Sequence, residues 1–210
     1  MSARSIPIHF ENENLVIAIK PAGTLSVPSR LGEKEERPVL GKILETQLNG
    51  RLFPVHRLDF EVSGLIIFAK NQKTHQILNQ AFEHKKIKKT YLAQTTGVAP
   101  EKGAKFEWKA KILRGKKRAY ESPVGKPSLT LAEYLGKKDE YLSWKLEPVT
   151  GRSHQLRFDL ARHGFPIVGD TLYGSTVKLD HHVIELRAVS IEMPEDLAKV
   201  LGIESRITSP

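Results

Sequence analysis

The chain of 210 residues contains no cysteine. Without thiols it can form neither disulfides nor zinc sites built on thiolates, and the absence fits a reducing compartment. The chain also lacks an apolar run of membrane-spanning length, and its first residues lack the apolar stretch of a signal peptide. We therefore expect a cytoplasmic protein that does not bind membranes, and nothing in the sequence requires a protein partner.

Acidic residues are outnumbered by basic ones. There are 33 lysines and arginines against 24 aspartates and glutamates, so the formal net charge is +9 at pH 7. Such a charge favours a polyanionic partner without identifying it. With 40% hydrophobic residues the chain has an ordinary globular composition and enough residues for a sizeable core. Because no internal repeat, low-complexity tract or linker is present, we predict a single domain over residues 1–210.

The hydrophobic pattern predicts more strands than helices. Strands are expected at 15–19, 65–69, from about 88, at 141–146 and at 183–191, and helices at 38–48, 72–83, from 150–153 to 163, and at 194–200. Several predicted strands follow one another without an intervening helix. This order predicts an α+β fold with a mixed, largely antiparallel central sheet and flanking helices.

The stretch from His56 to Lys70 combines two kinds of sequence. Residues 65–69 form an uninterrupted apolar run, which predicts a strand buried on both faces. Charged side chains, including Asp59, stand directly before that strand. Ionised groups near the interior lose hydration and need partners, so this arrangement is poor for stability and indicates a functional site. A loop leading into a central strand would hold Asp59 as a positioned carboxylate.

A second unusual segment lies between Glu107 and Glu121, where no acidic residue occurs. Its basic residues are Lys109, Lys111, Arg114, Lys116, Lys117 and Arg118. Such a cluster is more typical of a solvated face or a flexible hairpin tip, but it is also compatible with a surface that binds nucleic acid.

The residues His56-Arg57-Leu58-Asp59, with Ser63-Gly64-Leu65 and Phe68-Ala69-Lys70 behind them, resemble the active-site signature of the RluA family of RNA pseudouridine synthases. Further segments resemble the same family in the expected order. They are Lys20-Pro21-Ala22-Gly23, Lys89-Thr90-Tyr91-Leu92-Ala93 and Thr150-Gly151-Arg152-Ser153-His154-Gln155-Leu156-Arg157. The resemblance implies the catalytic-domain fold of that family, without a separate N-terminal RNA-binding domain.

The resemblance also implies a reaction. A uridine in structured RNA, ribosomal or transfer, would be converted to pseudouridine without a metal or another cofactor. The base must leave its stack, a nucleophile must hold an intermediate, and a proton must be removed from carbon. Asp59 is implied as the nucleophile, and the sequence leaves open whether it attacks the uracil ring or the ribose.

Other roles follow from the same resemblance. Arg157 would pair with Asp59 and favour its ionised form, although an ordinary structural ion pair is the alternative. Tyr91 would stack on the uracil and assist proton removal, unless it is simply a core residue. Arg57 would enter the RNA and fill the gap left by the flipped base. The remaining candidate RNA-binding residues are His56, Arg152, His154, Lys116, Lys117 and Arg118. For His56 and Arg152 the alternative is that they hold a loop in place.

Two positions depart from the family pattern. Val62 replaces a usual threonine and Arg187 a common histidine, and neither change removes a catalytic group. A metallohydrolase and a serine hydrolase are disfavoured, because the chain lacks the His-Glu-x-x-His and Gly-x-Ser-x-Gly patterns. The main alternative is a catalytically silent RNA-binding module derived from such a synthase.

Overall fold

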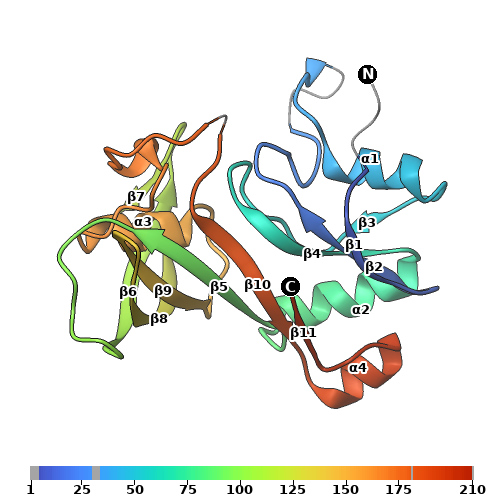
Figure 1. The fold of residues 1–210 in the computed structure, drawn as a ribbon. Coiled ribbons are helices and arrows are strands. Elements are labelled where there is room, and N and C mark those ends of the chain that lie inside the picture. The colour runs from blue at the N-terminus through green and yellow to red at the C-terminus, as the bar shows by residue number, and fades with distance from the viewer. Residues whose placement is uncertain (1–4, 30–33, 181, 210) are drawn as a thin grey trace. The chain divides into compact units, whose positions relative to one another are not determined.

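The computed structural model describes residues 5–29, 34–180 and 182–209. The chain divides into two compact units, each with its own helices and strands (Figure 1). Unit 1 comprises Met1–Ile87 and Ala188–Pro210, and unit 2 comprises Lys88–Arg187. Within the described ranges, no helix is both long and apolar enough to cross a membrane.

Unit 1 is built on a sheet whose central strands are buried. Its strands are β1 (Ile8–Glu11), β2 (Leu15–Lys20), β3 (Phe53–Pro54), β4 (Ser63–Ala69), most of β10 (Leu186–Glu192), and β11 (Arg206–Thr208). The order is β1-β2-β4-β10-β11, with β3 beside β4. Strands β2 and β4 pair antiparallel from Leu15 opposite Ala69 to Lys20 opposite Gly64. The prediction of a fully buried strand at 65–69 is confirmed.

Helices cover both faces of this sheet. Helices α2 (Gln72–Glu83) and α4 (Glu195–Leu201) supply Leu78, Ala81, Ala198 and Leu201 to the same core as Leu15 and Leu65. On the opposite face lies α1 (Leu40–Gln47), where a Cβ at Gly41 would be 3.6 Å from the Phe68 ring.

The bounds of α2 agree with the prediction, and its N-cap Asn71 accepts a hydrogen bond from Thr74 N. Helix α1 begins two residues later than expected, at Leu40. The reason is tertiary: Pro38 and Val39 extend alongside Leu25, whose backbone bonds to both Pro38 and Leu40.

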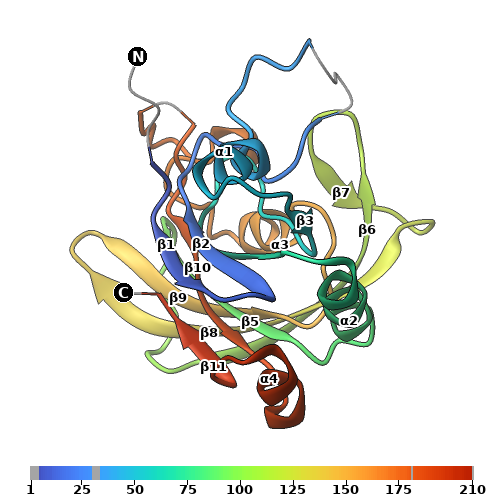
Figure 2. The same cartoon turned by 90° about the vertical axis from the view of Figure 1, so that its right-hand side faces the viewer.

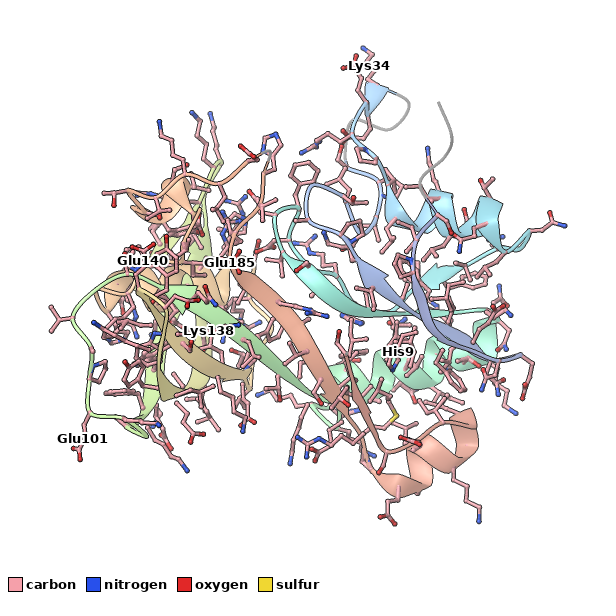
Figure 3. The ribbon with its side chains drawn as sticks, viewed as in Figure 1. His9, Lys34, Glu101, Lys138, Glu140 and Glu185 are labelled. Carbon is pink, nitrogen blue, oxygen red and sulfur yellow. The ribbon has the colours of Figure 1, made fainter. Side chains whose placement is uncertain are left out.

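Unit 2 contains an antiparallel sheet in the order β5-β9-β8-β6-β7. Its strands are β5 (Lys88–Thr95), β6 (Lys105–Arg114), β7 (Ala119–Glu121), β8 (Lys126–Lys138) and β9 (Tyr141–Pro148). Figure 2 shows the long hairpin of β8 and β9 and the shorter one of β6 and β7. Lys138 and Glu140, labelled in Figure 3, lie where β8 turns into β9.

One helix, α3 (Gln155–Arg162), contacts β7, β8 and β9 of this sheet. The core beneath it is aromatic, with Trp144 against Trp108, Tyr134 and Phe165 at centroid distances of 4.6–5.7 Å. The alternation predicted for residues 141–146 is confirmed, because Leu142, Trp144 and Leu146 are buried while their neighbours are partly exposed. Together the two units confirm the predicted α+β class.

Candidate active site

The loop that carries Asp59 spans residues 55–62, between β3 and β4 of unit 1. Ser26 holds this loop through two hydrogen bonds. The buried Ser26 Oγ donates to Leu58 O at 2.9 Å and accepts from Leu58 N at 3.0 Å. On the other side of Asp59, Gly23 N donates to Phe60 O at 2.9 Å. Val62 N closes the turn on Asp59 O at 3.2 Å. The backbone around the partly exposed Asp59 is therefore fixed at neighbouring residues.

His56 turns inward from this loop. Its Nε2 accepts a hydrogen bond from Ile67 N of β4 at 3.0 Å, and its ring lies 4.8 Å from that of Phe82 in α2. This geometry holds the start of the loop against the central strand. Arg57, the next residue, is exposed.

Gly64 marks the point where β4 leaves the loop. Its φ of +114° is rare for other residues, and a Cβ there would clash with the backbone of Ala188 in β10. Val62 is buried at 3% exposure, so the side chain that replaces the family's usual threonine packs in the core.

In unit 2, β5 carries Tyr91. The strand predicted from about residue 88 is confirmed, and its sides alternate: Tyr91, Ala93 and Thr95 are buried, whereas Leu92 is 43% exposed. Lys89 lies on the same side of the strand, and its burial lowers the pKa of its ammonium group. Tyr91 therefore has its ring held by the sheet at a fixed register opposite Leu146.

The loop before α3 is organised by Gln155, which is 3% exposed. Its Oε1 accepts from Thr150 Oγ1 and Arg152 N at 2.8 and 3.0 Å. Its Nε2 donates to Leu129 O and Thr130 Oγ1 at 3.0 and 2.9 Å. Helix α3 begins at Gln155, later than the predicted start at 150–153, and its N-cap is His154, in the left-handed conformation and without a side-chain capping bond.

Arg157 of α3 is buried beside Asp170. Arg157 Nε and Nη2 donate to the two carboxylate oxygens of Asp170 at 2.6 and 2.8 Å. The guanidinium also lies 5.3 Å from the ring centre of Tyr173. Tyr173 OH accepts from Ala119 N at 2.6 Å and lies 3.1 Å from His154 Nδ1. Burial raises the pKa of Tyr173, so its hydroxyl stays protonated at neutral pH.

The remaining candidates for RNA binding also belong to unit 2. Arg152 is half-buried, and its Nε donates to Pro127 O at 2.9 Å. Lys116, Lys117 and Arg118 are exposed at the tip of the β6–β7 hairpin, which Gly115 N closes on Arg118 O at 3.0 Å. In the part of the chain that the structure describes, no group of three metal-ligating side chains comes together.

Three buried polar residues that organise these segments received no role from the sequence: Lys20, Ser26 and Gln155. Each of the three bonds to a backbone group more than 20 residues away: Lys20 to Phe60, Ser26 to Leu58 and Gln155 to Leu129. Only the tertiary fold reveals these bonds. Lys20 could have attracted attention because it ends an apolar run and precedes a proline.

The chain is similar in sequence to known RNA pseudouridine synthases. Residues 14–162 match the family model described as RNA pseudouridylate synthase. The chain is 32% identical to tRNA pseudouridine synthase C of Haemophilus ducreyi over 182 residues, which cover 80% of this chain and 74% of that protein. It is 32% identical to the dual-specificity RNA pseudouridine synthase RluA of Vibrio parahaemolyticus over 196 residues, 85% of this chain and 76% of that protein.

Among solved structures, the fold resembles human RNA pseudouridylate synthase domain containing 1. The TM-score is 0.76 at 23% sequence identity, over 100% of this chain and 85% of the human one. At this identity the likeness concerns the fold alone.

Proposed function

Because this chain belongs to the RluA family of RNA pseudouridine synthases, we propose that it converts a specific uridine of a structured RNA into pseudouridine with Asp59 as the nucleophile. The enzymes of this family are isomerases. We further propose that residues of both units form one catalytic domain, since the matching family model runs from residue 14 in unit 1 to residue 162 in unit 2. A ribosomal or transfer RNA is the proposed substrate.

The observation that carries the proposal is the way the Asp59 loop is held. A nucleophile is effective when its position is fixed before the substrate arrives. Bonds at Leu58 O, Leu58 N, Asp59 O and Phe60 O restrain the backbone on both sides of Asp59. The side chain itself is partly exposed, so a base extruded from the RNA can reach it.

The isomerisation breaks the bond between ribose C1′ and uracil N1 and forms one between C1′ and C5. N1 gains a proton, C5 loses one, and no electrons are exchanged with a cofactor. In this proposal the Asp59 carboxylate holds the intermediate, while Tyr91 packs against the uracil and assists removal of the C5 proton. Nε and Nη2 of Arg157 bind Asp170, and Arg157 is the cation we assign to favour the ionised form of Asp59.

The other polar side chains are assigned to the RNA. Arg57 is exposed beside Asp59 and fills the space left by the flipped base. Arg152, His154 and the hairpin tip of Lys116, Lys117 and Arg118 contact the RNA backbone. His56 acts indirectly, because its Nε2 is bonded to Ile67 N and holds the loop that the RNA approaches.

The test is single-turnover tritium release from RNA transcripts labelled at uridine C5. Asp59→Asn is expected to abolish release while RNA still binds, because the amide preserves the shape but cannot act as an anionic nucleophile. Glu61→Gln removes the same charge two residues later and is expected to remain active.

Turnover by Asp59→Asn at near the wild-type rate would refute the proposed role of Asp59. If the wild type binds RNA but releases no tritium from ribosomal or transfer RNA, the silent RNA-binding module is the better description. If the wild type does release tritium, mapping pseudouridines in cells that lack the protein identifies the target nucleotide.

A further inference from the structure

Lys20 ends strand β2 with its side chain completely buried, at 0% exposure. Its Nζ donates to Thr24 O at 2.7 Å, to Pro21 O at 2.9 Å and to Phe60 O at 3.2 Å. An ammonium group has three donors, which match these three acceptors, whereas a neutral amine has two donors and a lone pair that would face the third carbonyl. These three carbonyl oxygens, which we call the Lys20 cage, therefore fit the charged form of Lys20.

One of the three carbonyl oxygens of the Lys20 cage, that of Phe60, belongs to the Asp59 loop. Phe60 follows Asp59 directly, and its carbonyl oxygen receives bonds from both Lys20 Nζ and Gly23 N. Lys20 thus fixes the peptide group next to the nucleophile, across a sequence separation of 40 residues. The link lies wholly within unit 1.

The cage itself carries no negative charge, since carbonyl oxygens are dipoles. A buried ammonium group is costly unless a negative charge lies near it. Burial lowers the pKa of Lys20 to about 8, and the charges of Asp59 and then Glu61 act in the opposite direction. By reciprocity, an ammonium group stabilised by Asp59 stabilises the Asp59 carboxylate by the same free energy.

We propose that Lys20 is a positioning residue for the reaction: its ammonium group fixes the backbone at Phe60 and keeps Asp59 ionised. This inference rests on the proposed role of Asp59. Lys20 is fully buried and acts through its neighbours, without touching the uridine. The role of Lys20 differs from that proposed for Arg157. Lys20 belongs to the same unit as Asp59 and holds the backbone of the Asp59 loop.

The absence of cysteine permits a test that removes the ammonium group, with its charge and its three donors, and keeps the length of the side chain. Lys20→Cys is alkylated in denaturant and refolded, in one sample with an aminoethyl group and in another with a propyl group. The two side chains have the same length, but only the first ends in an ammonium group. The pH dependence of kcat for tritium release is then measured for both samples.

In the propyl form, the acid limb of the kcat profile, which reports ionisation of Asp59, is expected to move up by about one pH unit. The reason is that a carboxylate without a nearby cation has a higher pKa. The aminoethyl form is expected to restore the wild-type limb. RNA affinity should be equal in both forms. Identical kcat profiles in the two forms would overturn the proposal and leave Lys20 with a packing role.

A second measurement uses unmodified lysine, and so applies even if neither alkylated form refolds. NMR of the Lys20 ammonium group gives its pKa in the wild type, in Asp59→Asn and in the exposed control Glu13→Gln. The pKa is expected to fall in Asp59→Asn and to stay unchanged in Glu13→Gln. An unchanged pKa in Asp59→Asn would show that the two groups are not coupled, and would overturn the proposal without reference to activity. A wild type without activity counts instead against the proposed function.

Discussion

Arg157 and Asp170 form a bidentate ion pair shielded from solvent, with side-chain exposures of 2% and 1%. The guanidinium is thereby oriented by a carboxylate of its own unit, reached through the loop after α3. Removing one member of such a pair leaves an uncompensated buried charge, which typically costs about 3 to 5 kcal/mol. Arg157 therefore combines a structural role with the catalytic one proposed for it.

The two roles can be separated by removing the pair as a whole. Arg157→Met is expected to lower the free energy of unfolding by about 3 to 5 kcal/mol and to abolish activity. Adding Asp170→Leu is expected to recover most of the stability, because an apolar pair of similar size avoids the desolvation of both charges. Urea unfolding and tritium release are measured on the same preparations.

Activity should not return in the double variant, since Asp59 still lacks the arginine assigned to it. The exposed variant Asp180→Asn serves as the control for loss of one carboxylate from unit 2. If the stabilised double variant regains activity, Arg157 acts only through stability.

Replacing Tyr91 by phenylalanine tests the hydroxyl group separately from the ring. The ring is buried on β5, so the fold and the RNA affinity should persist in Tyr91→Phe. Loss of a group that assists proton transfer typically slows a reaction by about 10²-fold or more, and kcat should fall by that order. Tyr134→Phe, at another buried tyrosine of the same sheet, is the control and should keep its kcat. Equal kcat in the two variants would leave Tyr91 with a stacking role only.

Asp159 makes stability depend on pH. It is buried, Thr130 Oγ1 donates to its Oδ2 at 2.7 Å, and Arg162 Nε lies 3.4 Å from its Oδ1. Burial raises the pKa of Asp159 from 3.8 to about 6, against the opposing effects of Thr130 and Arg162. The native state therefore holds this proton more tightly than the unfolded state.

Stability contributed by that proton is complete below about pH 4 and is lost as the pH rises through about 6. The loss is on the order of 2 to 3 kcal/mol. Asp159→Asn cannot titrate, so its free energy of unfolding relative to the wild type should increase between pH 4 and pH 7. Urea unfolding across that range measures the difference, with the exposed Asp196→Asn as control. A difference that does not change with pH would contradict the assignment.

The sequence predicts best those features that depend on local pattern. Helix α2 has the predicted bounds because its cap and its apolar stripe lie within residues 71–83. Strands β6 and β8 were not predicted. In β6, the charged residues on the exposed face obscure the alternation of buried and exposed positions. Lys20 and Gln155 also bond to Phe60 and Thr130, which lie 40 and 25 residues away and which no local pattern contains.

The basic hairpin tip should determine the salt dependence of RNA binding. Lys116, Lys117 and Arg118 are exposed and free to approach phosphates, each of which contributes a slope of about −0.7 to −0.9 in log affinity against log salt. Replacing all three by glutamine should therefore flatten the slope by roughly two units. Filter binding between low and physiological salt measures it.

A matched control removes the same charge elsewhere in unit 2. Lys102, Lys137 and Lys138 are exposed, and the last two belong to the β8–β9 hairpin. Their replacement by glutamine should change the slope much less if binding is local to the β6–β7 tip, and equal changes would indicate a general effect of net charge. Because phosphate contacts position the RNA without touching the bond that breaks, the tip variant should regain near-normal kcat at saturating RNA. A lasting loss of kcat with an unchanged slope would show that the tip supports the catalytic fold and does not bind RNA.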